Sequence, residues 1–122
     1  MKYCWTTITV RDMQKSLSFY RDLLGLSLDR TMKPNPEMEI AFLGDGETKV
    51  ELIYHAAKQD IKFGADISLG FVVDSIDDFS RVLAGKGIPI HSGPFQPNPS
   101  IRFIYIQDPD GLKIQLVENI GR

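Results

Sequence analysis

Two stretches decide the fold of this chain: "GDGETKVELIY" at residues 44–54 and "QDPDGLKIQLVE" at residues 107–118. Each contains a turn rich in glycine and aspartate, followed by a strand in which apolar and polar residues alternate. The middle of the strand is Glu51 in one stretch and Gln115 in the other. Alternate side chains of a strand point to opposite faces of its sheet. Glu51 and Gln115 are therefore predicted to point away from the apolar face that packs on a helix.

The segments around these strands repeat one order of elements. The first half has its helix pattern at residues 13–24, after a capping Asp12, and strand patterns at residues 2–10, 26–32, 38–43 and 49–55. The second half has its helix pattern at residues 76–83, after a capping Ser75, and strand patterns at residues 67–73, 88–92, 101–107 and 112–118. The sequence therefore predicts a single domain over residues 1–122, made of two βαβββ repeats at about residues 3–55 and 67–118.

Composition restricts the classes of function. Hydrophobic residues make up 43% of the chain and charged residues 25%, which is typical of a globular domain. The net charge of -2 and the absence of a basic run argue against nucleic-acid binding. No apolar segment approaches the roughly 18 residues of a membrane span, and the start lacks a signal-peptide pattern, so we expect a cytoplasmic protein. The single cysteine, Cys4, is expected to be a buried thiol in an apolar strand.

The repeated units, with "VRDMQKSLSFYRDLLGL" at residues 10–26 and "DPDGLKIQLVE" at residues 108–118, resemble the vicinal oxygen chelate superfamily. This superfamily includes glyoxalase I, extradiol dioxygenases, fosfomycin-resistance enzymes and bleomycin-binding proteins. The resemblance implies an α+β fold in which two paired βαβββ modules form a curved eight-stranded mixed sheet around a cavity. It also implies a homodimer, with the cavity formed within one chain or across two.

In the glyoxalase-like members, each unit supplies two metal ligands, one on its first strand and one on its last, typically His and Glu. The positions that correspond here are Trp5, Glu51, Ser68 and Gln115. The indole nitrogen of tryptophan is only a donor, and serine is a poor ligand for transition metals. Glu51 keeps the usual ligand and Gln115 offers a neutral, weak one. We therefore expect no metal cofactor, with Glu51 and Gln115 as the weak candidates for holding one.

The same four positions suit a binding site for a small organic molecule. Trp5 is expected either to wall the ligand pocket or to pack in the core. Glu51 and Gln115 would fix polar groups of the ligand, with Ser68 beside them. As a carboxylate facing a cavity, Glu51 would otherwise need a structural ion pair. Three cations are candidates for that pair: Lys49, Arg102 and Lys113.

Aromatic residues are expected to complete the pocket. Alternation along residues 101–107 places Phe103 and Tyr105 on one face, where they line the pocket or pack in the core. Residues 92–100, rich in proline, are expected to form a loop that is either a pocket rim or a plain connector.

These residues favour a small-molecule-binding protein of the bleomycin-resistance type that lacks the catalytic metal. The alternative is a metal-dependent lyase or isomerase like glyoxalase I, of the lactoylglutathione lyase type, in which Glu51 would be the catalytic carboxylate. A third interpretation is a structural domain whose cavity is filled by its own side chains.

Overall fold

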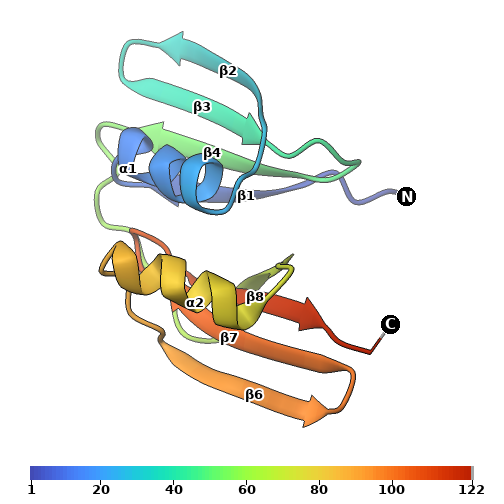
Figure 1. Cartoon of the computed structure of the whole chain (residues 1–122). Coiled ribbons are helices and arrows are strands. Elements are labelled where there is room, and N and C mark those ends of the chain that lie inside the picture. Colours follow the sequence, from blue (N-terminus) through green and yellow to red (C-terminus); the bar gives the residue numbers. More distant parts are fainter. Residues whose placement is uncertain (122) are drawn as a thin grey trace. The chain divides into compact units, whose positions relative to one another are not determined.

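The computed structural model describes residues 1–121, and its internal contacts divide the chain into two compact units, Met1–Lys62 and Phe63–Arg122. Each unit has a four-stranded sheet in which its first strand lies beside its fourth, the fourth beside the third, and the third beside the second (Figure 1). In both sheets the first and last strands of the unit pair in parallel, and the remaining neighbours are antiparallel. The fold is the α+β arrangement of two βαβββ modules that the repeated pattern predicts.

The elements of the N-terminal unit follow the predicted order. They are β1 (Trp5–Val10), α1 (Met13–Leu17), the π-helical turn η1 (Ser18–Leu23), β2 (Leu28–Asn35), β3 (Met38–Leu43) and β4 (Lys49–His55). Asp12 caps α1 by accepting a hydrogen bond from the backbone N–H of Lys15 at 3.1 Å. The predicted helix at residues 13–24 is therefore confirmed in extent, although its second half has π-helical hydrogen bonding.

One face of the N-terminal sheet forms a core with the helix. Its buried residues come from β1, β3, β4 and the helical segment: Ile8, Val10, Met13, Leu17, Tyr20, Ala41, Leu43 and Leu52. Glu51, which neighbours Leu52 on β4, belongs to the other face by alternation. The prediction that Glu51 points away from the helix-packed face is therefore confirmed.

The C-terminal unit repeats this plan. Its elements are β5 (Ser68–Val72), α2 (Ile76–Gly85), β6 (Ser92–Asn98), β7 (Ile101–Gln107) and β8 (Lys113–Asn119). Ser75 caps α2 by accepting a hydrogen bond from the backbone N–H of Asp78 at 3.1 Å. The Glu118 carboxylate of β8 accepts a second hydrogen bond from the N–H of Ile76 at 2.7 Å. Glu118, near the end of β8, thus fixes the start of α2, the helix that packs on this sheet.

The core of the C-terminal unit lies between α2 and its sheet. Six side chains that are completely buried come from α2, β7 and β8: Ile76, Leu83, Ile104, Ile106, Ile114 and Leu116. The turn before β8 is held by Asp108, whose carboxylate accepts the N–H groups of Asp110 and Leu112, both at 2.9 Å. Gly111 in this turn has φ +90°, a conformation that side chains with a Cβ rarely adopt. The turn predicted at "DPDG" is therefore confirmed.

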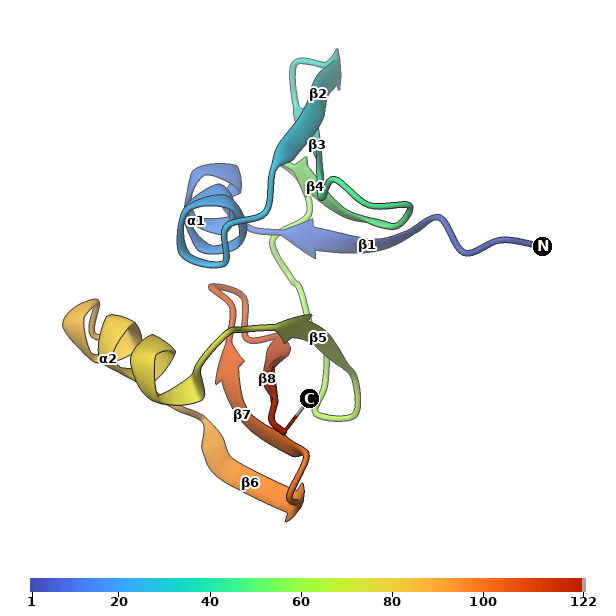
Figure 2. The same ribbon diagram turned by 45° about the vertical axis from the view of Figure 1, so that its right-hand side comes forward.

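The loop predicted at residues 92–100 is wrong over most of its length. Residues Ser92–Asn98 form β6, the edge strand beside β7, whereas most of the strand predicted at residues 88–92 lies outside regular structure (Figure 2). The pairing of β6 with β7 shifts register between Ser92 and Phe95 and again before Asn98. Proline is tolerated at such a bulged sheet edge because no ladder hydrogen bond from it is needed there. Residues Ser92–Asn98 thus have the glycine and proline content typical of a loop, but they form a strand.

The prediction for Cys4 is also wrong. Cys4 lies before β1 and is exposed, because the strand begins at Trp5 and the preceding residues lie outside the sheet. Among the residues that the structure describes, no helix has the length and apolar character needed to cross a membrane.

Candidate functional site

The N-terminal half of the candidate site lies on the face of its sheet opposite the helix. β1 and β4 pair so that Thr7 lies across from Glu51 and Trp5 lies across from Lys49. The Thr7 hydroxyl donates a hydrogen bond to Glu51 Oε1 at 2.5 Å. Glu51 retains 8% of its exposure, so its carboxylate is removed from most of the solvent. The structure thus places Trp5 and Glu51 as diagonal neighbours on one face.

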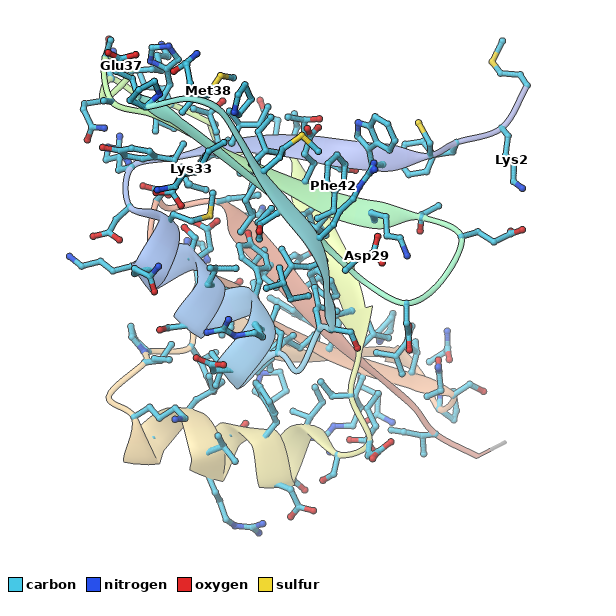
Figure 3. The ribbon with its side chains drawn as sticks, turned by 90° about the horizontal axis from the view of Figure 1, so that it is seen from above. Lys2, Asp29, Lys33, Glu37, Met38 and Phe42 are labelled. Atoms are coloured by element: carbon cyan, nitrogen blue, oxygen red, sulfur yellow. The ribbon has the colours of Figure 1, made fainter. Side chains whose placement is uncertain are left out.

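Two aromatic rings flank this carboxylate. Phe42 on β3 lies directly across from Glu51 in the antiparallel pairing of β3 with β4. The rings of Trp5 and Phe42 meet edge to face, with centroids 5.2 Å apart and planes at 73°. The Arg30 guanidinium of β2 lies 4.6 Å from the centroid of Phe42. Figure 3 labels Phe42, near the end of β3, and Glu37 and Met38, where the chain turns from β2 into β3.

The cations proposed as partners of Glu51 have other contacts. Lys49 donates to the backbone carbonyls of Gly44 at 2.7 Å and Gly46 at 3.0 Å, in the turn before β4. Arg102 forms ion pairs with Asp77 at 3.3 Å and Glu118 at 4.0 Å. Lys49 therefore stabilises the turn before β4, and Arg102 stabilises the start of α2.

The C-terminal half-site has the same register. Ser68 lies across from Lys113, and Gly70 lies across from Gln115. A Cβ built on Gly70 would approach Gln115 Oε1 to 3.6 Å, an ordinary contact distance. Ser68 and Gln115 are therefore diagonal neighbours, as Trp5 and Glu51 are in the other unit.

An aromatic cluster extends this half-site along β6 and β7. Phe103 and Tyr105, predicted to share a face, have ring centroids 5.8 Å apart, and Phe95 lies 5.5 Å from Phe103 and 6.4 Å from Tyr105. Lys113 places its ammonium 4.8 Å from the centroid of Tyr105. The third cation proposed for Glu51 thus has an aromatic contact in its own unit.

Comparison with known proteins assigns the family. A model of the Glyoxalase/Bleomycin resistance protein/Dioxygenase superfamily matches residues 2–116. The chain belongs to this superfamily. Among its relatives in the superfamily, the lactoylglutathione lyase of Haemophilus influenzae is 32% identical, over 98% of this chain and 93% of its own. A probable lactoylglutathione lyase of Synechocystis is 34% identical, over 96% of this chain and 95% of its own.

Solved structures of glyoxalase family proteins share the fold. A glyoxalase family protein from Bacillus cereus superposes with a TM-score of 0.84 at 22% identity, covering 99% of this chain and 95% of the other. The trypanothione-dependent glyoxalase I of Leishmania major superposes with a TM-score of 0.82 at 23% identity, covering 97% and 86%. At these identities, the likeness extends to the fold alone.

The donor set does not fit the metal that this superfamily's lyases imply. Trp5 offers an indole whose N–H is only a donor, and Ser68 offers a neutral hydroxyl. Within either unit, the described residues contain no group of three or more His, Cys, Asp or Glu side chains arranged to hold a metal ion. An ordinary catalytic zinc site takes three protein ligands. Trp5, Glu51, Ser68 and Gln115 therefore do not supply the donor set of an ordinary catalytic metal site.

Sequence reasoning missed four residues of these half-sites. Two of them could have been found from strand alternation. Thr7 shares a face of β1 with Trp5, and Phe42 shares a face of β3 with Ile40. Arg30 lies on a strand whose residues are all exposed, and no local pattern connects it with Phe42. Phe95 was hidden because its segment has the composition of a loop.

Proposed function

We propose that this superfamily member binds a small organic molecule with the residues around Trp5 and Glu51, and that it does so without the metal of the lyases. We propose Ser68, Phe103, Tyr105 and Gln115 of the C-terminal unit as further ligand-binding residues. The observation that carries this proposal is the donor set: an indole and a hydroxyl stand at two of the four positions expected to carry ligands. Fold alone does not determine activity, so the side chains at the site take precedence.

Each residue has a role that its chemistry permits. The Glu51 carboxylate accepts hydrogen bonds from a ligand, and the Gln115 amide both donates and accepts. Trp5 offers a large apolar surface of which 41% is exposed, so its ring can contact a ligand. Aromatic walls with a few polar groups are the usual composition of small-molecule sites.

The test combines metal analysis with thermal shift. We expect no stoichiometric Ni, Zn, Mn or Fe in purified protein dialysed against each metal, and no rise of the melting temperature. A small-molecule library should contain ligands that raise it, because a ligand that binds only the folded state stabilises that state. One metal ion per site with stabilisation would overturn the proposal.

Engineered histidines test the assignment of the four positions. Trp5→His alone should still bind no stoichiometric metal, because Ser68 leaves the ligand set incomplete. If the four positions correspond to the ligand positions of the superfamily's lyases, the double variant Trp5→His with Ser68→His should bind Zn or Ni, because two imidazoles then add to the Glu51 carboxylate. Elemental analysis after dialysis measures both. Retention of one ion per site by the single variant would show that the positions are misassigned.

A metal-dependent lyase like glyoxalase I is the second candidate. Relatives named lactoylglutathione lyase, at 32% and 34% identity over nearly the whole chain, favour it. In that case Glu51 would be the catalytic carboxylate, and Glu51→Gln would abolish the activity. A lactoylglutathione lyase assay of the metal-supplemented protein separates the two candidates, because a protein that only binds its ligand would show no turnover in this assay.

We also propose that the protein is a homodimer, as the resemblance implies, and that it is cytoplasmic. Light scattering on the purified protein should give twice the chain mass of 13.8 kDa. A mass of one chain would contradict the dimer.

A further inference from the structure

The aromatic pair in the N-terminal unit lies over the strand that carries Glu51. Trp5 and Phe42 belong to β1 and β3, the two neighbours of β4 in the sheet. These strands lie about 10 Å apart, at two interstrand spacings. Their rings nevertheless approach to 5.2 Å between centroids, at 73°. The two side chains therefore lean toward each other across β4 and form a corner of two aromatic walls beside the carboxylate.

The charge of Glu51 is poorly compensated by the protein. Its side chain has 8% exposure, and Thr7, a neutral donor, is its hydrogen-bonding partner among the described residues. No Lys, Arg or His of the described part of the chain forms an ion pair with it. Removing a carboxylate from water without a cationic partner is unfavourable. A ligand that brings a positive charge would relieve this cost.

The aromatic corner already has one cation contact. Arg30 places its guanidinium 4.6 Å from the centroid of Phe42, within the range of a cation–π interaction. Arg30 is exposed on the edge strand β2, so its guanidinium is also accessible to water. Phe42 itself is only 4% exposed and has the Arg30 guanidinium over its ring, so a ligand cation reaches this ring by displacing Arg30. The Glu51 carboxylate lies across from the same residue.

We infer that the ligand of this site is an organic ammonium compound, whose charged nitrogen lies against the exposed ring of Trp5, displaces Arg30 from the ring of Phe42 and pairs with Glu51. This inference rests on the proposed function and names its ligand class. An ammonium group combines the two contacts that the corner offers, cation–π and a charge-assisted hydrogen bond. A neutral ligand would use only the apolar walls, and an anion would be repelled by Glu51.

The test uses three probes that differ only in the head group. Phenethylamine is a cation at pH 7, 2-phenylethanol is neutral, and phenylacetate is an anion. Trp5 is the sole tryptophan of the chain, so its fluorescence reports binding at this corner directly. We expect phenethylamine to bind at least about tenfold more tightly than 2-phenylethanol, because hydrogen bonds to charged groups are the stronger ones.

Three variants test the origin of this preference. Glu51→Gln keeps the acceptor for Thr7 and removes the charge, so the preference for phenethylamine should vanish. Glu37→Gln, at an exposed position of the β2–β3 turn, removes the same charge elsewhere and should leave the preference unchanged. Arg30→Met frees the Phe42 face and removes a like charge, so phenethylamine should bind about threefold more tightly.

The outcomes separate this inference from the proposed function. Equal or tighter binding of 2-phenylethanol or phenylacetate would overturn the ammonium class, while small-molecule binding would stand. Absence of any fluorescence response to phenethylamine would overturn the class as well. Stoichiometric metal in the protein would instead overturn the proposed function. If Glu51→Gln fails to fold, the gain in Arg30→Met decides, and an unchanged or reduced affinity there counts against the inference.

Discussion

Among the described residues, the group that donates a hydrogen bond to the Glu51 carboxylate is the neutral hydroxyl of Thr7, at 2.5 Å. A hydroxyl that donates to an ionised acceptor orients one carboxylate oxygen and leaves the other for a ligand. Thr7 is exposed and lies on β1, directly across from Glu51, so its backbone position is set by the sheet. We expect Thr7 to act as a positioning residue for Glu51.

Replacing Thr7 by valine tests this role. Thr7→Val removes the hydroxyl, so the free energy of unfolding should fall by about 1–3 kcal/mol, the cost of leaving a buried acceptor unsatisfied. Urea denaturation measures the change, and Thr7→Ser should recover most of it. Thr9→Val, two residues along the same face, is the matched control and should be near neutral. Equal losses in both variants would assign the effect to the strand and not to Glu51.

At the scale of elements, the structure shows how β6 pairs although it has the composition of a loop. Gly93 has φ +101°, and a Cβ there would lie 3.0 Å from the carbonyl oxygen of Phe103 on β7. The backbone of β6 therefore approaches its neighbour more closely than any other residue type allows. This approach places Phe95 beside Phe103, where it joins the aromatic cluster.

A glycine-to-alanine pair tests this close approach. Gly93→Ala should destabilise the protein by about 1–3 kcal/mol, through backbone strain and the contact with Phe103. Gly85→Ala, at the end of α2 with nothing within 4 Å of the new Cβ, should be neutral or stabilising by up to about 1 kcal/mol. Thermal unfolding compares them. Similar behaviour of the two variants would contradict the role assigned to Gly93.

The start of α2 provides a second prediction at this scale. Ser75→Ala removes the side-chain acceptor of the Asp78 N–H, so the free energy of unfolding should fall by about 1 kcal/mol. Ser75→Gly should cost only a few tenths of that, because glycine leaves the helix end open to water. Chemical denaturation of both variants measures the difference. A larger loss for glycine than for alanine would show that backbone freedom dominates at this position.

At the scale of the whole molecule, the chain consists of two units of the same topology, each with its own buried core. Leu52 on β4 and Leu116 on β8 are both completely buried, each directly after the central polar residue of its strand. Their equivalence follows from the shared register, in which Thr7 and Gly70 lie across from Glu51 and Gln115.

Two core truncations test whether the two cores contribute independently to the free energy of unfolding. Leu52→Ala and Leu116→Ala should each lower the free energy of unfolding by about 2–5 kcal/mol. Their effects should add within about 0.5 kcal/mol in the double variant, because the two leucines have no shared neighbours if each core is separate. Urea denaturation of the wild type, both single variants and the double variant closes the cycle. A larger deviation would show that the two cores are energetically coupled.

The accuracy of the sequence predictions differed between elements for physical reasons. β3, β4 and β7 match their predicted residues fully, because alternation and flanking turns mark strands that are half buried. The first cap, Asp12, and the second, Ser75, match because side-chain capping is a local interaction. The strand β6 was predicted as a loop because its local sequence is rich in glycine and proline. Its pairing with β7 leaves no signal in that local sequence.

The sequence by itself determined the α+β class, the two repeats, and the face on which Glu51 and Gln115 lie, because each follows from periodicity and short-range turns. The tertiary structure alone decided which residues contact them. The hydrogen bond from Thr7, the aromatic corner of Trp5 and Phe42, and the addition of Phe95 to the aromatic cluster depend on strand register. Register joins residues far apart in the chain, and it is set by the packing of whole sheets and not by any local run of sequence.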